Sequence, residues 1–200
     1  MPNTKVGMYD VDDSSAKDIS SFPYLNPNEF SVACSAFLPR LHQSQLQAKL
    51  IYNESKIIVG IELVTWKVCD RAEITTVAHI LLSPVYLLPT LYFTCTSTND
   101  NGEYHPITLV SEVYEATSMT ENIKSMMKAP SMLQFSSSGT ISQCQHPLHD
   151  TVCFYVHPCH TGDVMSTINE DPEADSIGLD SYLAIWIGIV GGAVGITLKG

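Results

Sequence analysis

The residue with the clearest chemical potential in this sequence is Cys159, which follows an apolar stretch and a His157-Pro158 pair. A run of β-branched and aromatic residues predicts a strand over 152–157, and Pro158 predicts that this strand ends there. Thr161, followed by Gly-Asp-Val-Met, has the pattern of a helix N-cap. We therefore expect Cys159 to lie in a short gap between strand and helix, where backbone N–H groups and the helix dipole favour the nucleophilic thiolate.

Two other interpretations are possible for this region, a zinc site and a cysteine hydrolase. Seven cysteines and histidines fall within 17 residues: Cys144, His146, His149, Cys153, His157, Cys159 and His160. Such a cluster can bind zinc, but it contains no Cys-x-x-Cys pair and its spacings match no common zinc module. A cysteine hydrolase would need a histidine base and an Asn or Asp to orient it, and no order of motifs singles out these partners. A zinc-stabilised, non-catalytic interaction module and a cysteine hydrolase of ubiquitin-like conjugates therefore stay open as alternatives.

The other cysteines have a plainer interpretation. Cys34, Cys69, Cys95 and Cys153 lie within apolar patterns, where a thiol usually behaves as a small buried hydrophobe. The first residues are polar and run into Asp10, with no apolar stretch like a signal peptide. We therefore expect free thiols, a reducing compartment and a cytoplasmic protein.

The secondary structure predicted around Cys159 indicates an α+β fold. Apolar residues at helical spacing predict a helix over 28–41, with Pro39 expected to kink it or end it early. Three successive strands with short connections then suggest an antiparallel meander. The strands are expected at 57–70 with a bulge or bend at Gly60, at 73–82 with Ile74, Thr76, Ala78, Ile80 and Leu82 on one side, and at 86–96 with an interruption at Pro89.

Later segments carry weaker signals. Residues 43–53 are ambiguous between helix and strand, and 107–114 between strand and short helix. We expect a turn at 99–102, a helix at 121–128, a loop at 136–139, a short extended piece at 140–145 and an exposed acidic loop at 169–178. Residues 1–27 are expected to form a flexible acidic N-terminal tail, and residues 28–200 a single catalytic domain.

Charge and hydropathy narrow the range of partners. Ten Lys plus Arg against 21 Asp plus Glu give a net charge of −11, so we expect no nucleic acid and favour a basic protein partner. The apolar stretch 183–198 has 16 residues, fewer than the roughly 20 that span a bilayer. We therefore expect a helix buried by the domain's own sheet, with its N-cap at Asp180 or Ser181, and no stable membrane insertion.

Three blocks of sequence together resemble the autophagy E2-like conjugating enzymes. His157-Pro158-Cys159, preceded by the aromatic strand and by Gln145-His146-Pro147, resembles the active-site region of that family. Residues 83–93 are similar to its Tyr-x-x-Pro element, and residues 181–186 to its closing helix. The chain is short and Cys159 is followed by Thr161 and Asp163, so it resembles the branch that modifies a protein rather than a lipid.

This resemblance implies a ubiquitin-conjugating-enzyme-like fold with a central antiparallel sheet flanked by helices. It also implies a thioester between Cys159 and the C-terminal glycine of a ubiquitin-like modifier, autophagy protein twelve. The implied partners are an E1-like activating enzyme, the modifier, and the acceptor that carries the target lysine, autophagy protein five. No cofactor and no metal are implied.

The resemblance leaves the oxyanion donor open. Ordinary ubiquitin-conjugating enzymes carry an Asn shortly before the cysteine, and no Asn occurs here from residue 123 to residue 167. In the family, the Tyr of the Tyr-x-x-Pro element lies near the cysteine, which points to Tyr86 in the transfer step. Gln143 or His146 would supply the missing donor. The strand 57–70 is the candidate edge for the acceptor, and the acidic loop at 170–175 is a candidate for steering a basic partner.

Overall fold

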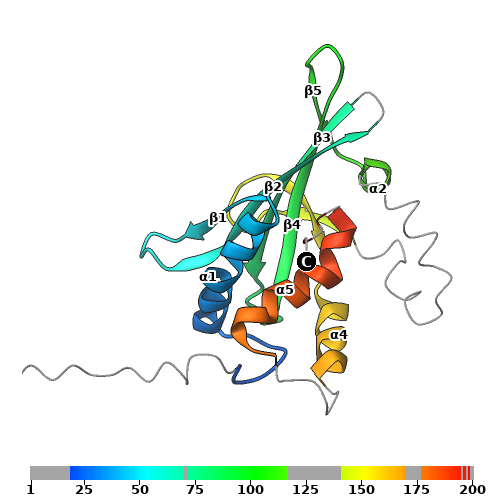
Figure 1. Ribbon diagram of the computed structural model, residues 1–200. Helices are drawn as coiled ribbons and strands as arrows, with labels where there is room; N and C mark the ends of the chain where they lie inside the picture. The colour runs from blue at the N-terminus through cyan, green and yellow to red at the C-terminus, as the bar shows by residue number, and fades with distance from the viewer. Residues whose placement is uncertain are drawn as a thin grey trace, which may run out of the picture.

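The computed structural model describes residues 19–69, 72–116, 141–169, 177–194, 196 and 198, and shows a twisted antiparallel sheet with helices packed against it (Figure 1). The helices are α1 (Pro27–Gln43), α2 (Val110–Ala116), α4 (Cys159–Asn169) and α5 (Leu179–Val190), with a 3₁₀ turn η1 (Gly191–Val194) after α5. The strands are β1 (Gln47–Tyr52), β2 (Ile58–Cys69), β3 (Ala72–Leu82), β4 (Pro89–Thr98), β5 (Tyr104–Ile107), β6 (Ile141–Gln145) and β7 (Val152–Val156).

The strands of the described residues form one sheet in the order β1-β2-β3-β4-β7-β6, with β5 paired to part of β4. Neighbouring strands are antiparallel throughout, so the predicted meander is confirmed for β2, β3 and β4. The ambiguous stretch 43–53 contains strand β1, and 140–145 contains β6. The α+β class with a central antiparallel sheet and flanking helices is confirmed.

One face of the sheet carries the hydrophobic core. Four of the five residues predicted on one side of β3 are buried, namely Ile74, Thr76, Ala78 and Ile80. Leu82 is only half-buried, and His79 and Leu81 between them are buried as well. Leu91 and Phe93 of β4 continue this layer, and α1 and α5 cover it (Figure 1). Because side chains alternate across a strand, the residues between them face the opposite side of the sheet. None of the described helices packs on this side, which is called the helix-free face below.

Helix α1 is longer than its periodicity suggested. Asn26 caps it by accepting hydrogen bonds from the backbone of Asn28 and Glu29, and the Glu29 carboxylate accepts from the Asn26 N–H, which completes a capping box. The expectation that Pro39 would end the helix early is wrong, because α1 continues to Gln43. Pro39 lies on the exposed side of the last turns, so the helix loses one backbone hydrogen bond there but no core contact.

Residues 19–27 lie within the range that the composition assigned to a loose tail, yet they pack against the domain. Leu25 is fully buried, and its N–H donates to the Leu87 carbonyl. The Tyr182 hydroxyl of α5 donates to the Pro23 carbonyl at 2.5 Å. The packed part of the chain therefore begins before residue 28, and the tail stays a prediction for residues 1–18, which lie outside the described residues.

The apolar segment near the end of the chain forms α5, whose inward face is buried against α1 and the sheet. Trp186 and Ile187 are each 1% exposed, which confirms the prediction of a buried helix. Its N-cap is Gly178, without a side-chain cap, and not Asp180 or Ser181. Among the described residues, no helix has both the length and the apolar character needed to cross a membrane.

Other predicted segments meet mixed outcomes. The turn at 99–102 is present, with Gly102 at a φ of 77°. The stretch 107–114 contains the end of β5 and the start of α2. At Gly60 a side chain would come within 2.5 Å of the Ile80 carbonyl oxygen, and the β1–β2 register shifts beside it, as expected for a bulge. The predicted helix at 121–128, the loop at 136–139 and most of the acidic loop lie outside the described residues.

Candidate active site

The junction between β7 and α4 places Cys159 as the first residue of a helix. Strand β7 ends at Val156, the predicted strand at 152–157 is therefore confirmed, and α4 begins at Cys159. The Pro158 carbonyl accepts from the Thr161 N–H at 3.1 Å and from the Thr161 hydroxyl at 2.8 Å. Backbone N–H groups at the start of a helix lack intrahelical acceptors, so the sequence places a thiol-bearing residue where negative charge is favoured.

The expected N-cap at Thr161 is wrong, because it would start the helix at residue 162 and α4 begins three residues earlier, at Cys159. Thr161 is 4% exposed, and its hydroxyl donates back to a carbonyl instead of accepting from a backbone N–H. Pro158 explains the earlier start: its fixed φ suits the entry to a helix, and it supplies the carbonyl that the first turn uses.

The connection between β3 and β4 is anchored against this junction. The ring of Tyr86 meets the ring of His157 edge-on, with centroids 5.5 Å apart and planes at 68°. Leu88 lies directly against α4, since a side-chain carbon added at Gly162 would meet it at 3.0 Å. Tyr86 belongs to this connection and not to the strand that was predicted from residue 86, because β4 begins at Pro89. The structure thus brings Tyr86 beside the residue two positions before Cys159.

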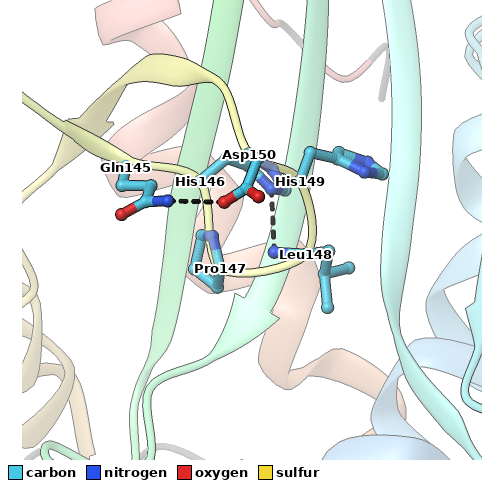
Figure 2. A pocket seen from close by; sticks show the side chains of 6 residues that line it. All are labelled: Gln145, His146, Pro147, Leu148, His149 and Asp150. Carbon is cyan, nitrogen blue, oxygen red and sulfur yellow. Dashed lines mark hydrogen bonds between the residues drawn. The ribbon is translucent and has the colours of Figure 1, made fainter.

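His146 lies on the helix-free face, in the loop between β6 and β7 (Figure 2). Its Nδ1 accepts from the Leu148 N–H at 3.1 Å, which places the proton of the neutral ring on Nε2. The Nε2–H then donates to Nδ1 of His79 at 3.2 Å, and His79 Nε2–H donates to the Glu62 carboxylate at 3.2 Å. Glu62 also binds Lys49 at 2.7 Å, so the chain of contacts runs across three strands.

Burial favours the neutral form of both histidines. Burial and, to a smaller extent, the neighbouring His79 and His149 together lower the pKa of His146 to about 4. Burial also lowers the pKa of His79, against the opposing pull of the Glu62 carboxylate. His146 is 5% exposed, and both of its ring nitrogens are engaged. A role as oxyanion donor would require this network to open, and that role stays a prediction.

The amide of Gln143, the other predicted donor, is also engaged. Its Nε2 donates to the Thr108 carbonyl at 2.6 Å, which connects β6 to the segment before α2. The loop between β6 and β7 forms an open hollow of about 490 Å³ (Figure 2). Its lining is the loop itself, Gln145 to Asp150, where the Gln145 amide donates to the Asp150 carboxylate at 2.6 Å. This hollow belongs to the helix-free face and not to the first turn of α4.

The prediction of buried thiols is confirmed where the structure describes them. Cys34, Cys95 and Cys153 are 2% exposed or less, and the side chain of Cys69 lies outside the described part. Within the described side chains, no three His, Cys, Asp or Glu residues are placed to hold a metal ion. This leaves the zinc-stabilised module without geometric support among those residues, while the side chains of Cys159 and His160 are outside the description.

The family description "Autophagocytosis associated protein, active-site domain" matches residues 53–199 of the chain. The chain belongs to this family. The match spans all three blocks on which the resemblance was based, and so confirms it. Helix α1 precedes the matched region, and α5 lies within it.

The most similar relatives include three proteins named "Ubiquitin-like-conjugating enzyme ATG10". The protein from Gibberella zeae is 32% identical over 127 residues, covering 63% of this chain and 47% of the relative. Those from Homo sapiens and Dictyostelium discoideum are 27% identical over 120 residues and 26% identical over 126 residues, covering 48% and 50% of the relatives. The chain spans about half the length of the curated relatives it matches. A solved structure titled "Solution structures of KmAtg10" covers 88% of this chain and 98% of its own, with 14% identity and a TM-score of 0.48.

The sequence did not reveal the network on the helix-free face. His79 is the register partner of Glu62 on β2 and of Tyr92 on β4. The ring centroid of His146 lies 5.7 Å from that of Tyr92. The alternation in β3 does place His79 opposite the buried side chains, so its face was predictable. Its partners follow only from strand register, which the sequence does not specify.

Proposed function

We propose that this chain is an E2-like conjugating enzyme of autophagy whose nucleophile is Cys159. Family membership supports this role, and so do the names of the three relatives. The observation that carries it is the place of Cys159 at the first position of α4, directly after the strand that is paired to the centre of the sheet. A helix start lowers the pKa of a thiol and raises the fraction of nucleophilic thiolate.

The proposed reaction has two acyl transfers. The Cys159 sulfur attacks the thioester carbonyl at the C-terminal glycine of a ubiquitin-like modifier, and the thiol of an E1-like activating enzyme leaves. A lysine amine of the acceptor protein then attacks the new thioester, loses a proton and releases the Cys159 thiolate. We propose autophagy protein twelve as the modifier and autophagy protein five as the acceptor, by resemblance to the family branch.

Tyr86 is proposed to act in the second transfer. Its ring lies against His157, two residues before the nucleophile, and it is 40% exposed, so an incoming acceptor can reach it. A phenol beside the thioester can donate a hydrogen bond to the oxygen that gains charge. The four cysteines whose side chains are described are all free, which suits a reducing compartment, and we propose the cytoplasm.

A charging assay tests the function. The chain is mixed with activating enzyme, ATP and modifier, and should form an adduct that a thiol reductant removes. Cys159→Ala should form none, whereas Cys34→Ala serves as a control at a buried thiol in α1. A cysteine hydrolase would instead cleave a reporter attached to the modifier's C-terminus. Charging that persists in Cys159→Ala would refute the assignment.

A further inference from the structure

Cys144 and Cys153 face each other across the β6–β7 hairpin. They are register partners in an antiparallel pair, and their sulfur atoms are 3.7 Å apart. Directly opposed residues in such pairs have Cα atoms about 4.5–5.5 Å apart, within the range of about 4.4–6.8 Å found in disulfides. A bond of about 2.05 Å therefore requires only that the two sulfurs close the remaining gap by side-chain rotation.

The two thiols differ in their access to solvent. Cys144 is partly exposed, whereas Cys153 is 2% exposed. Burial and, to a smaller extent, the neighbouring Cys144 thiol together raise the pKa of Cys153 to about 12. An oxidant in solution therefore reacts with Cys144 first, and the buried Cys153 thiol is in position to react with the oxidised Cys144.

We propose that Cys144 and Cys153 form a reversible disulfide when the protein meets a peroxide, an oxidation site separate from Cys159. This oxidation is independent of the conjugation reaction, because it involves neither the first turn of α4 nor any partner protein. It concerns a pair of thiols held in contact by strand register.

The chemistry balances in two steps. The Cys144 sulfur attacks one oxygen of hydrogen peroxide, the O–O bond breaks, and the other oxygen leaves as water, which gives a sulfenic acid. The Cys153 sulfur then attacks the Cys144 sulfur while its proton passes to the leaving hydroxide, and a second water departs. Two thiols are oxidised to one disulfide, and one peroxide is reduced to two waters. A thiol reductant reverses the bond.

The bond would restrain the hairpin that supports the helix-free face. Strand β6 is tied to Thr108 through Gln143, and the loop between β6 and β7 carries His146 onto His79. A link between the two strands limits the freedom of the unfolded chain, so the oxidised form should unfold at higher temperature. Amide hydrogen exchange within 141–156 should also become slower.

The test maps the disulfide by mass spectrometry after treatment with stoichiometric hydrogen peroxide. No Lys or Arg lies between residues 128 and 199, so trypsin leaves Cys144, Cys153 and Cys159 on one peptide. Chymotrypsin separates them, because Leu148 lies between the first two and Phe154 between the last two. Cys159→Ser provides a background without the third thiol.

Wild type and Cys159→Ser should each give a linked peptide pair joining Cys144 to Cys153, with the loss of two hydrogens and recovery on reduction. Cys144→Ser should give no link and leave Cys153 free for alkylation after unfolding. The proposal is overturned if both thiols of the wild type remain free after Cys159 has been oxidised, or if Cys159 is the residue that pairs with either of them. Because the main measurement is made on the wild type, it does not depend on a variant that folds.

Discussion

Cys153 and Cys159 lie six residues apart, one inside a strand and the other at the start of a helix, and they illustrate opposite uses of the same side chain. Cys153 lies within strand β7, is 2% exposed and is the register partner of Cys144. Its pKa is raised to about 12. Cys159 instead opens α4, after a proline that ends the strand. A strand interior suppresses the thiolate, whereas a helix start favours it.

The comparison shows that the backbone transition at Pro158 separates the two roles. Before it, β7 lies between β4 and β6 and contributes Phe154 and Val156 to the core. After it, the chain turns into α4, held from one side by Leu88 against Gly162. Changes within β7 should therefore act on stability, and changes around α4 should act on transfer.

The largest expected effect is on stability. Phe154→Ala should lower the free energy of unfolding by about 3–5 kcal/mol, because this side chain is 3% exposed and packs against Phe93 with ring centroids 5.5 Å apart. Val152→Ala, in the same strand but 71% exposed, should change it by less than about 0.5 kcal/mol. Urea unfolding measures both, and equal losses would show that β7 does not anchor the sheet as described.

A smaller effect should come from pH on the helix-free face. The pKa of His146 is lowered in the folded state, so the unfolded chain takes up a proton first as pH falls. The stability contributed by the neutral ring is complete above about pH 6.5 and declines as pH falls toward 4. Between pH 7 and pH 5 this group should account for about 1–2 kcal/mol of lost stability.

The measurement is the difference in unfolding free energy between pH 7 and pH 5. His146→Gln should reduce that difference. An unaltered pH dependence in His146→Gln would contradict the neutral pairing of His146 with His79. Charging of Cys159 is not expected to follow this titration.

The smallest expected effect is on the rate of transfer to lysine, compared with the rate of charging. Tyr86→Phe keeps the ring against His157 but removes the hydroxyl, so it should slow transfer to lysine by about 3- to 10-fold, the value of one hydrogen bond. Charging from the activating enzyme should change less. Single-turnover rates for the two steps decide the point, with Tyr104→Phe, 75% exposed on β5, as the control. Equal slowing of both steps would exclude a specific role in transfer.

Much of this arrangement was predictable because it depends on local pattern. Alternation in β3 identified the buried face, and the aromatic run before Pro158 identified β7. The three blocks around Tyr86, Cys159 and Trp186 also indicated the family before any contact was known. These features follow from periodicity and from residue types that end strands and begin helices.

What was missed depends on contacts between distant segments. The sequence could not show that Pro39 would lie on the solvent side of α1, or that Pro158 would supply the helix start in place of Thr161. The pairing of His79 with His146 joins segments far apart in the chain, and that of Cys144 with Cys153 depends on the register of the β6–β7 hairpin. Register is set by the folded sheet as a whole, so residue patterns place side chains on a face but not opposite one another.

The most direct measurement of the central claim is the chemical nature of the adduct formed on Cys159→Ser. With activating enzyme, ATP and modifier, wild type should form a reductant-sensitive thioester, and Cys159→Ser a reductant-resistant ester that alkali removes. Peptide mapping should locate the ester at residue 159, in a variant that retains Cys153. A reductant-sensitive adduct on Cys159→Ser would place the nucleophile on another cysteine and contradict the account.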